Sequence, residues 1–320
     1  MDVIFCATKF EIFGFLRKLK ILKKSIVKNS GFYSCLFENS KKVIIVITGI
    51  GRNSAEMACR HFLAQVVGEN VGASSNAEKS KEINTDNIFG NDMSSLPNNN
   101  AYSMEYNIII TGFGGSLTDD LKVGDLVLVN EIVNLEKKYI NDDGFCFVVS
   151  GRIKTKNSIL KKMFLKKTES DAIFNDSSDR IIYSDACCAT LDEVVNSNEQ
   201  KEAVAMASGA SILDMETYSI VKNLNNLENK SFLCLRTISD DNENNLPDFI
   251  KFFSNRGFLS GSKFFSRNYF ISYLKGFFKC FAFLLIKPAN IRSLFRFLKN
   301  ISLAEKTLSM AIERLIKNSI

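Results

Sequence analysis

Short apolar stretches, each followed at once by a glycine turn or an acidic residue, recur along this 320-residue chain. They have the length and content of buried strands, and helix-like segments separate them. Strands that alternate with helices predict an α/β sheet covered on both faces, and such sheets bind ligands at the carboxyl ends of their strands. The residues found at the predicted strand ends are Glu11, Gly49–Gly51, Gly112–Gly115, Ser184–Asp185, Glu216 and Asp240. Their recurrence predicts a ligand site at one edge of the sheet.

The expected elements divide the chain into three parts. Residues 1–67 and 105–245 hold the strands and helices and should form one catalytic domain. Residues 68–104 are rich in Asn, Ser, Glu and Lys and predict a disordered surface insertion. Residues 246–320 predict a basic, aromatic, helical extension. The fold class we expect is a three-layer α/β sandwich with a mixed central sheet, followed by this extension.

Local patterns give further boundaries. Apolar residues near helical spacing predict a helix over 9–24. The run 112–117 is expected to be a glycine loop after a strand at 106–111, and a strand at 181–184 is expected to end in Ser184–Asp185. A helix is expected over 198–208, before the buried strand that delivers Glu216.

The sequence excludes several chemistries. It contains 1 histidine, His61, so catalytic triads, Cys–His pairs and multi-histidine metal sites are not indicated. The 8 cysteines form no CxxC pair, and we expect neither a metal nor a cofactor. Scattered cysteines and an N-terminus that begins directly with a strand fit a cytoplasmic protein.

Charge is unevenly distributed, with a net value of +6. From residue 251 onward, 13 lysines and arginines face 2 glutamates, which predicts contact with something anionic. Residues 263–299 combine these bases with many aromatic residues, so we expect either peripheral contact with the inner face of a membrane or packing on the body or on a dimer partner. The longest uninterrupted apolar run there, Cys280–Ile286, is too short to span a bilayer. The aromatic content also argues against nucleic acid as a partner.

Two acids at helix starts allow a structural explanation as well as a functional one. Glu216 and Glu11 can each stabilise a helix dipole, or each can serve a ligand. The turn Gly49–Gly51, followed by Arg52 and a helix, is a common cradle for phosphate or sugar, although glycine turns also merely change the chain direction.

Five motifs in register resemble the nucleoside phosphorylase and nucleosidase superfamily, especially its methylthioadenosine/S-adenosylhomocysteine nucleosidase branch. They are Cys6–Glu11, Thr48–Arg52, Thr111–Gly115 with Leu121–Asp125, Asp214–Glu216 and Arg236–Asp240. The layout of the tail, through Leu246–Pro247, Lys287–Pro288 and Ala304–Leu308, resembles the hopanoid-associated nucleosidase/phosphorylase branch most.

The resemblance implies a mechanism. Asp240 would donate a proton to N7 of the leaving purine, and Glu11 would activate the attacking water. Glu216 would hold the ribose hydroxyls, with Met215 packed beside the ribose. A transition state with a cationic sugar and an anionic base needs a carboxylate near the first and an acid near the second.

The same resemblance and the strand-end pattern complete the expected substrate-binding set, which adds Gly112, Phe113, Gly114, Ser184, Asp185, Ser239, Gly51, Arg52 and Arg236. Arg236 is expected either to orient Glu11 or a neighbour, or to form a structural ion pair. Two positions depart from the family pattern: Phe113 stands where many of these nucleosidases have serine, and Ser116 replaces a glycine.

The implied activity is release of adenine from an adenosine with a bulky apolar 5′ group, as in adenosylhopane, by a protein that is expected to be a homodimer. The alternatives are a methylthioadenosine/S-adenosylhomocysteine nucleosidase with an unrelated tail, and a phosphate-dependent phosphorylase. A superfamily member that has lost catalysis and only binds or scaffolds is the alternative from another class.

Overall fold

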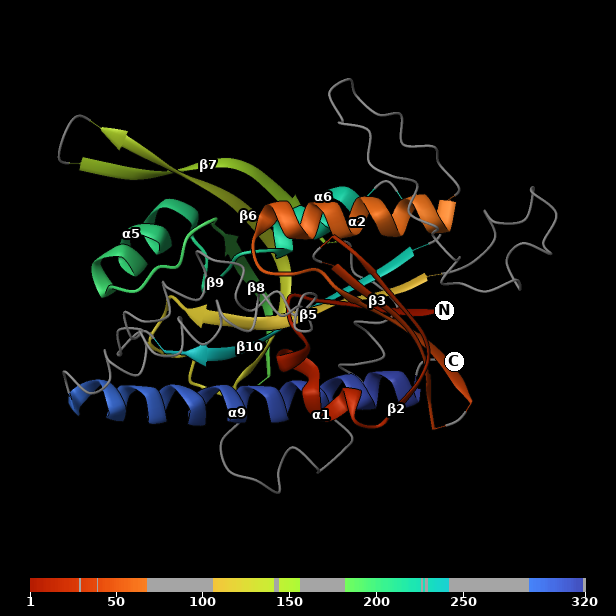
Figure 1. Ribbon diagram of the computed structural model, residues 1–320. Helices are drawn as coiled ribbons and strands as arrows, with labels where there is room; N and C mark the ends of the chain where they lie inside the picture. Colours follow the sequence, from red (N-terminus) through yellow and green to blue (C-terminus); the bar gives the residue numbers. More distant parts are fainter. Residues whose placement is uncertain are drawn as a thin grey trace.

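The computed structural model describes residues 1–28, 30–38, 40–67, 106–140, 144–155, 182–225, 227, 230–241 and 288–318. The predicted insertion 68–104 and the first part of the predicted extension, 246–287, lie outside these residues. Figure 1 shows a twisted central sheet with helices on both sides. None of the described helices has a stretch long and apolar enough to cross a membrane.

The sheet has ten strands within the described ranges, joined in the order β10-β6-β8-β9-β5-β1-β4-β3-β2, with β7 paired to β6. It is mixed: β1 runs parallel to β4 and β5, and β10 runs parallel to β5. The strands are β1 (Asp2–Cys6), β2 (Leu19–Val27), β3 (Ser30–Phe37), β4 (Lys41–Ile47), β5 (Tyr106–Ser116), β6 (Leu126–Ile140), β7 (Gly144–Lys154), β8 (Ile182–Thr190), β9 (Ile212–Asp214) and β10 (Lys230–Asp240).

One end of the sheet closes on itself. Strand β10 pairs with both β5 and β6, while β6, β8, β9 and β5 pair in turn, so five strands form a ring. The carboxyl ends of β1, β5 and β10 therefore lie side by side, because these three strands are parallel neighbours.

Helices cover both faces. On one face lie α2 (Arg52–Val67) and α6 (Thr217–Leu224), and on the other α9 (Pro288–Asn318) lies with the 3-10 turn η1 (Lys9–Ile12) and α1 (Phe13–Leu16) (Figure 1). Helix α5 (Asn198–Ser208) packs against β7. The described residues form three apolar cores: Phe5 and Phe62 lie in the first, Ile45 and Leu308 in the second, and Val204 of α5 in the third. The predicted three-layer α/β sandwich with a C-terminal helix is confirmed.

The C-terminal helix α9 packs against the segment that carries Glu11 and is hydrogen-bonded to it. Its buried residues Ala304, Leu308, Ala311 and Leu315 recur at helical spacing and bury one stripe against the sheet. Glu305 Oε1 accepts a 2.6 Å hydrogen bond from the backbone N–H of Gly14, just after η1. Helix α9 thus belongs to the body of the fold.

The predicted helix over 9–24 is wrong beyond Leu16. The chain forms η1 and α1 and then turns into the edge strand β2, which pairs with β3. Spacing of three between apolar residues also fits a strand that alternates irregularly, and the branched residues Ile21, Ile26 and Val27 favour that strand. Backbone hydrogen bonds to β3 therefore stabilise residues 19–27 as a strand rather than as a helix.

Two predicted strand ends are also wrong. Strand β5 continues through the expected glycine loop to Ser116, because β10 pairs with it as far as Gly115. Strand β8 continues past Ser184–Asp185 to Thr190, and its register against β6 shifts there. Asp185 has φ of 69°, so the pair forms an irregularity within a strand.

Candidate active site

A cavity of about 420 Å³ opens at the carboxyl ends of β1, β5 and β10. Its polar lining is concentrated in carboxylates and one amine, which are Glu11, Glu193, Asp214, Glu216, Asp240 and Lys201. The rest is mainly apolar and includes Phe10, Phe113, Met215 and four residues of α9, namely Leu294, Phe297, Leu298 and Ile301. The site therefore joins a set of ionisable groups to an apolar wall.

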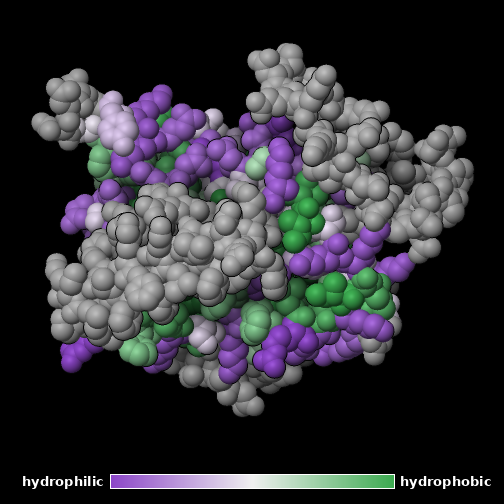
Figure 2. All heavy atoms as spheres, viewed as in Figure 1, coloured by the Kyte–Doolittle hydropathy of each residue, from purple (hydrophilic) through white to green (hydrophobic). Residues whose placement is uncertain are grey.

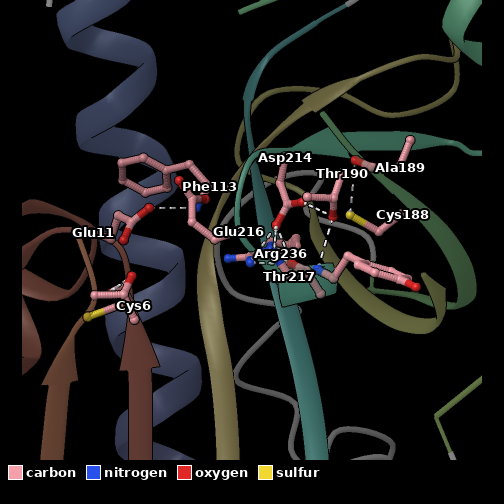
Figure 3. Close-up of polar contacts among 12 residues, drawn as sticks. Cys6, Glu11, Phe113, Cys188, Ala189, Thr190, Asp214, Glu216, Thr217 and Arg236 are labelled. Atoms are coloured by element: carbon pink, nitrogen blue, oxygen red, sulfur yellow. Dashed lines mark hydrogen bonds and ion pairs between the residues drawn. The ribbon is translucent and has the colours of Figure 1, made fainter. Parts of the chain in front are cut away.

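Glu11 is fixed by the turn that carries it. The backbone N–H of Thr8 donates to its Oε2 at 2.9 Å. The N–H of Phe113 donates to Oε1 at 3.3 Å, as Figure 3 shows. Burial raises the pKa of Glu11, although these N–H groups and the charge of Arg236 oppose the shift. A side chain at Gly112 would collide with this arrangement, because an added Cβ would lie 2.9 Å from Glu11 Oε1.

Glu216 lies at the junction of β9 and α6, on the other side of the same cavity. Gly51 donates its backbone N–H to Glu216 Oε1 at 2.7 Å, and Gly51 can do so because it adopts φ of 87° in the turn before α2. Burial, with the charges of Asp214 and Glu11, raises the pKa of Glu216 to about 8. Figure 3 shows Glu216 between Glu11 and the Asp214–Arg236 pair.

Arg236 and Asp214 form a buried ion pair next to Glu216. Arg236 Nη2 lies 2.6 Å from Asp214 Oδ2, and their side chains are only 2% and 1% exposed. Asp214 also accepts from the Thr190 hydroxyl at 2.7 Å and from the Thr217 N–H at 3.0 Å (Figure 3). These partners occupy both oxygens of Asp214, so this carboxylate holds Arg236 and the start of α6.

Asp240 ends β10 and has two polar neighbours. Lys201 Nζ of α5 lies 3.0 Å from Asp240 Oδ2, and the Ser239 hydroxyl donates to Oδ1 at 3.0 Å. The carboxylate also packs on the backbone of Gly115, where an added Cβ would lie 2.9 Å from Oδ2. Asp240 is thus held in one orientation at the rim of the cavity.

The structure brings most of the predicted residues together. Glu11, Phe113, Gly114, Met215, Glu216, Ser239 and Asp240 line the cavity. Gly51 and Gly112 stand just behind it, where they contact or make room for Glu216 and Glu11.

Two predicted residues, Arg52 and Asp185, lie elsewhere. Arg52 Nη2 donates to the carbonyl of Thr190 at 3.1 Å and its Nε lies 3.2 Å from Asp192, so this guanidinium ties loops together. Asp185 is exposed, accepts from Asn130 and is not part of the cavity lining, whereas the side chain of Ser184 lies outside the described part of the chain.

The sequence reasoning missed Lys201 and the wall formed by α9. A lysine within Asn198–Ser208 looks like one of several polar residues on an amphipathic helix, and its helix was predicted correctly. The only sequence signal was its place among small apolar residues. The α9 wall gave a periodic apolar pattern, but no pattern shows which cavity a helix will cover.

Within the described ranges, no group of three or more histidine, cysteine, aspartate or glutamate side chains is arranged to hold a metal ion.

The fold is shared with solved nucleosidases. The chain is similar to a 5′-methylthioadenosine/S-adenosylhomocysteine nucleosidase from Helicobacter pylori with butyl-thio-DADMe-Immucillin-A (16% identity, TM-score 0.54, 98% of this chain and 97% of that chain). It is also similar to the native futalosine hydrolase of Helicobacter pylori (16%, 0.53, 98% and 97%). A third similar structure is the corresponding nucleosidase from Neisseria meningitidis with methylthio-immucillin-A (17%, 0.51, 81% and 91%).

At these identities the likeness establishes the fold. No curated protein matches the chain. The family model described as the phosphorylase superfamily matches residues 3–258, which is most of the sequence. The chain belongs to the phosphorylase superfamily.

Proposed function

We propose that this protein is a purine nucleosidase that cleaves the N-glycosidic bond of a 5′-modified adenosine by acid-assisted hydrolysis and releases adenine. The observation that carries the proposal is the presence of Glu11, Glu216 and Asp240 in one cavity at the carboxyl ends of neighbouring strands. Three carboxylates in this superfamily fold suit a reaction in which a sugar becomes cationic while a base leaves as an anion.

Each carboxylate has a distinct task in this proposal. Asp240 protonates the leaving purine, Glu216 accepts hydrogen bonds from the ribose hydroxyls, and Glu11 takes the proton of the attacking water. Burial raises the pKa of both Glu11 and Glu216. A cationic sugar between them would favour their ionised forms, so the site would stabilise the transition state more than the neutral substrate.

Water is favoured over phosphate as the nucleophile. A phosphate site would call for a free cationic side chain, usually arginine. Among the described residues that line the cavity there is no arginine, and the one lysine is paired with Asp240. Arg52, the arginine nearest the glycine turn in sequence, is engaged with Asp192 and Thr190.

The apolar wall supports a bulky apolar 5′ substituent of the adenosylhopane kind. Phe10, Phe113 and Phe297 line the cavity together with aliphatic residues of α9. A methylthio or homocysteine group would use less of this wall. Methylthioadenosine or S-adenosylhomocysteine is the second candidate substrate, because nucleosidases for these compounds share the fold.

Three expectations remain predictions: peripheral membrane contact through residues 263–299, a homodimer, and a cytoplasmic location at the inner face of a membrane. The described part of 263–299, which belongs to α9, supports the membrane contact. On α9, Phe295 is 69% and Leu298 48% exposed beside the exposed Arg292, Arg296 and Lys299. Figure 2 shows hydrophobic and hydrophilic residues side by side along the lower edge, where α9 lies in Figure 1.

The test is release of free adenine from 5′-methylthioadenosine and from an adenosine with a long apolar 5′ group, each with and without phosphate. Turnover of the second compound in the absence of phosphate is the expected result. Efficient turnover of methylthioadenosine alone would favour the second candidate, and an absolute need for phosphate would make the protein a phosphorylase. No adenine from either compound would favour a binding role.

A further inference from the structure

Lys201 is a buried lysine that lines the cavity. Its side chain is 1% exposed, and its Nζ lies 3.0 Å from Asp240 Oδ2 and 2.6 Å from the backbone oxygen of Asp241. Helix α5, which carries Lys201, is anchored at its start, where the Ser197 side chain accepts from the backbone N–H of Gln200. Burying an ammonium group is costly, and a fold keeps one only where a partner compensates for the lost water.

The pairing raises a question for the proposed function, on which this inference rests. Asp240 is the proposed proton donor, yet both of its oxygens accept hydrogen bonds, Oδ2 from Lys201 and Oδ1 from the Ser239 hydroxyl. Hydrogen bonds and a neighbouring cation both favour the ionised carboxylate. An ionised carboxylate has no proton to give to a purine.

The other charged groups at the cavity do not provide that proton. Glu11 is hydrogen-bonded to backbone N–H groups, and the proposal gives it the task of accepting a proton. Asp214 is paired with Arg236, and Glu193 lies 2.9 Å from Lys137 of β6. Glu216 accepts from Gly51 and is proposed to hold the ribose hydroxyls. Lys201 is the described cation that touches Asp240, and its ammonium carries protons that can be donated.

We propose that Lys201 supplies, through Asp240, the proton that leaves with the purine. An Nζ–H bond of the ammonium breaks and its proton passes to the carboxylate, while the carboxyl group gives a proton to the purine. The C1′–N9 bonding electrons move into the purine ring. Lys201 is left as a neutral amine and Asp240 as an anion.

The proton balance closes over the cycle. The attacking water loses a proton to Glu11, and after the products leave, the Lys201–Asp240 pair takes up one proton from solvent while Glu11 returns one. Lys201 Nζ and Asp240 Oδ2 lie 3.0 Å apart, so the proton can pass directly from the ammonium to the carboxylate.

The experiment compares Lys201→Met and Lys201→Arg with wild type and with Lys222→Met, a matched change at an exposed lysine of α6. For each protein, kcat is measured against pH on a purine nucleoside and on 4-nitrophenyl riboside, whose leaving group needs no proton. Thermal melts show whether each variant is folded.

We expect Lys201→Met to lower kcat on the nucleoside by about 100- to 1000-fold, the usual worth of a general acid. The alkaline limb of its pH profile should move to lower pH, because an ordinary carboxylic acid loses its proton at lower pH than an ammonium group does. The 4-nitrophenyl riboside rate should stay within a few-fold. Lys201→Arg should not restore the nucleoside rate, because a guanidinium does not release its proton.

An unchanged nucleoside rate and profile in Lys201→Met would overturn the inference and leave the proposed function intact. Full rescue by Lys201→Arg would also overturn it, since only the positive charge would then matter. If neither variant folds, the alkaline limb of the wild type is measured at several temperatures. A limb that moves to lower pH on warming reports an ammonium and supports the inference, and one that stays in place contradicts it. Absence of any nucleoside turnover by wild type would overturn both proposals.

Discussion

The backbone N–H of Gly51 donates a 2.7 Å hydrogen bond to Glu216 Oε1, so the turn after β4 holds a carboxylate that is 165 residues away in the chain. The bond connects the Thr48–Arg52 motif with the Asp214–Glu216 motif, which are far apart in the sequence. It also fixes one oxygen of Glu216 and leaves the second available to the cavity. Burial and two neighbouring acids raise the pKa of this carboxyl to about 8, which has consequences for stability.

Glu216→Gln should flatten the dependence of stability on pH. The folded protein keeps the Glu216 proton up to a pKa of about 8, whereas an unfolded glutamate loses it near pH 4.3. Between these values unfolding releases a proton, so the free energy of unfolding of the wild type falls as pH rises and levels off above about 8. Glutamine has no such proton but can still accept from Gly51. At pH 8.5 the variant should be more stable than wild type by about 1–3 kcal/mol.

Urea denaturation at pH 5, 7 and 8.5 checks this, with Glu202→Gln at an exposed site of α5 as the control. The control should follow the wild type within about 0.5 kcal/mol at each pH. Glu11, whose pKa is also raised, should leave some slope in Glu216→Gln. Parallel curves for wild type and Glu216→Gln would show that Glu216 is ionised in the folded protein at neutral pH.

Removing one partner of the Arg236–Asp214 pair should be strongly destabilising. Arg236→Met leaves the Asp214 charge buried and unpaired, and Asp214→Asn does the same to Arg236, so each should cost about 3–5 kcal/mol. The double variant should cost clearly less than the sum. The control cycle uses Arg60 and Glu56, an exposed pair at 2.5 Å on α2, where coupling should be below about 1 kcal/mol. Additive effects at Arg236 and Asp214 would show that the two charges are not coupled.

Asp240→Asn should slow turnover strongly without unfolding the protein. The amide keeps the shape of the side chain but cannot pass a proton to the purine, so kcat should fall about 100- to 10,000-fold. Substrate affinity, measured by calorimetry, should change little. A near-normal rate in Asp240→Asn would assign the proton donor to another group.

Helix α9 should determine how well an apolar 5′ group is accepted. Phe297→Ala removes part of the cavity wall, and Phe295→Ala is the matched control because Phe295 is 69% exposed and does not line the cavity. Phe297→Ala should lower kcat/KM for the apolar substrate roughly 5- to 30-fold, equivalent to about 1–2 kcal/mol of lost burial. Its kcat/KM for unsubstituted adenosine should change less than about threefold. If both variants lowered kcat/KM for the apolar substrate equally, the cavity wall formed by α9 would not determine substrate specificity.

The positions of the main acids could be predicted because they follow buried strands directly. Asp240 ends β10, which runs parallel to β5, and Glu216 follows β9, which runs antiparallel to β5; both acids line the cavity as expected. The helix over 198–208 was also predicted correctly, since Ser197 and Gly209 mark its two ends.

The remainder depended on contacts between segments far apart in sequence. Strand β2 forms because β3 lies beside it, and β5 passes through its glycines because β10 pairs there. The pairing of Lys201 with Asp240 joins residues 39 positions apart, and α9 reaches the cavity from the end of the chain. The pattern of residues within one segment does not show which distant segment it will contact.

The most direct test of the account is the fate of the sugar when the protein acts on an adenosine with a long apolar 5′ group in oxygen-18 water with phosphate present. Mass spectrometry of the products should show free adenine and a sugar that carries one oxygen-18 atom at C1′. Adenine together with a sugar 1-phosphate would contradict hydrolysis. A failure to release adenine from this substrate and from methylthioadenosine would contradict the central claim that the protein is a purine nucleosidase.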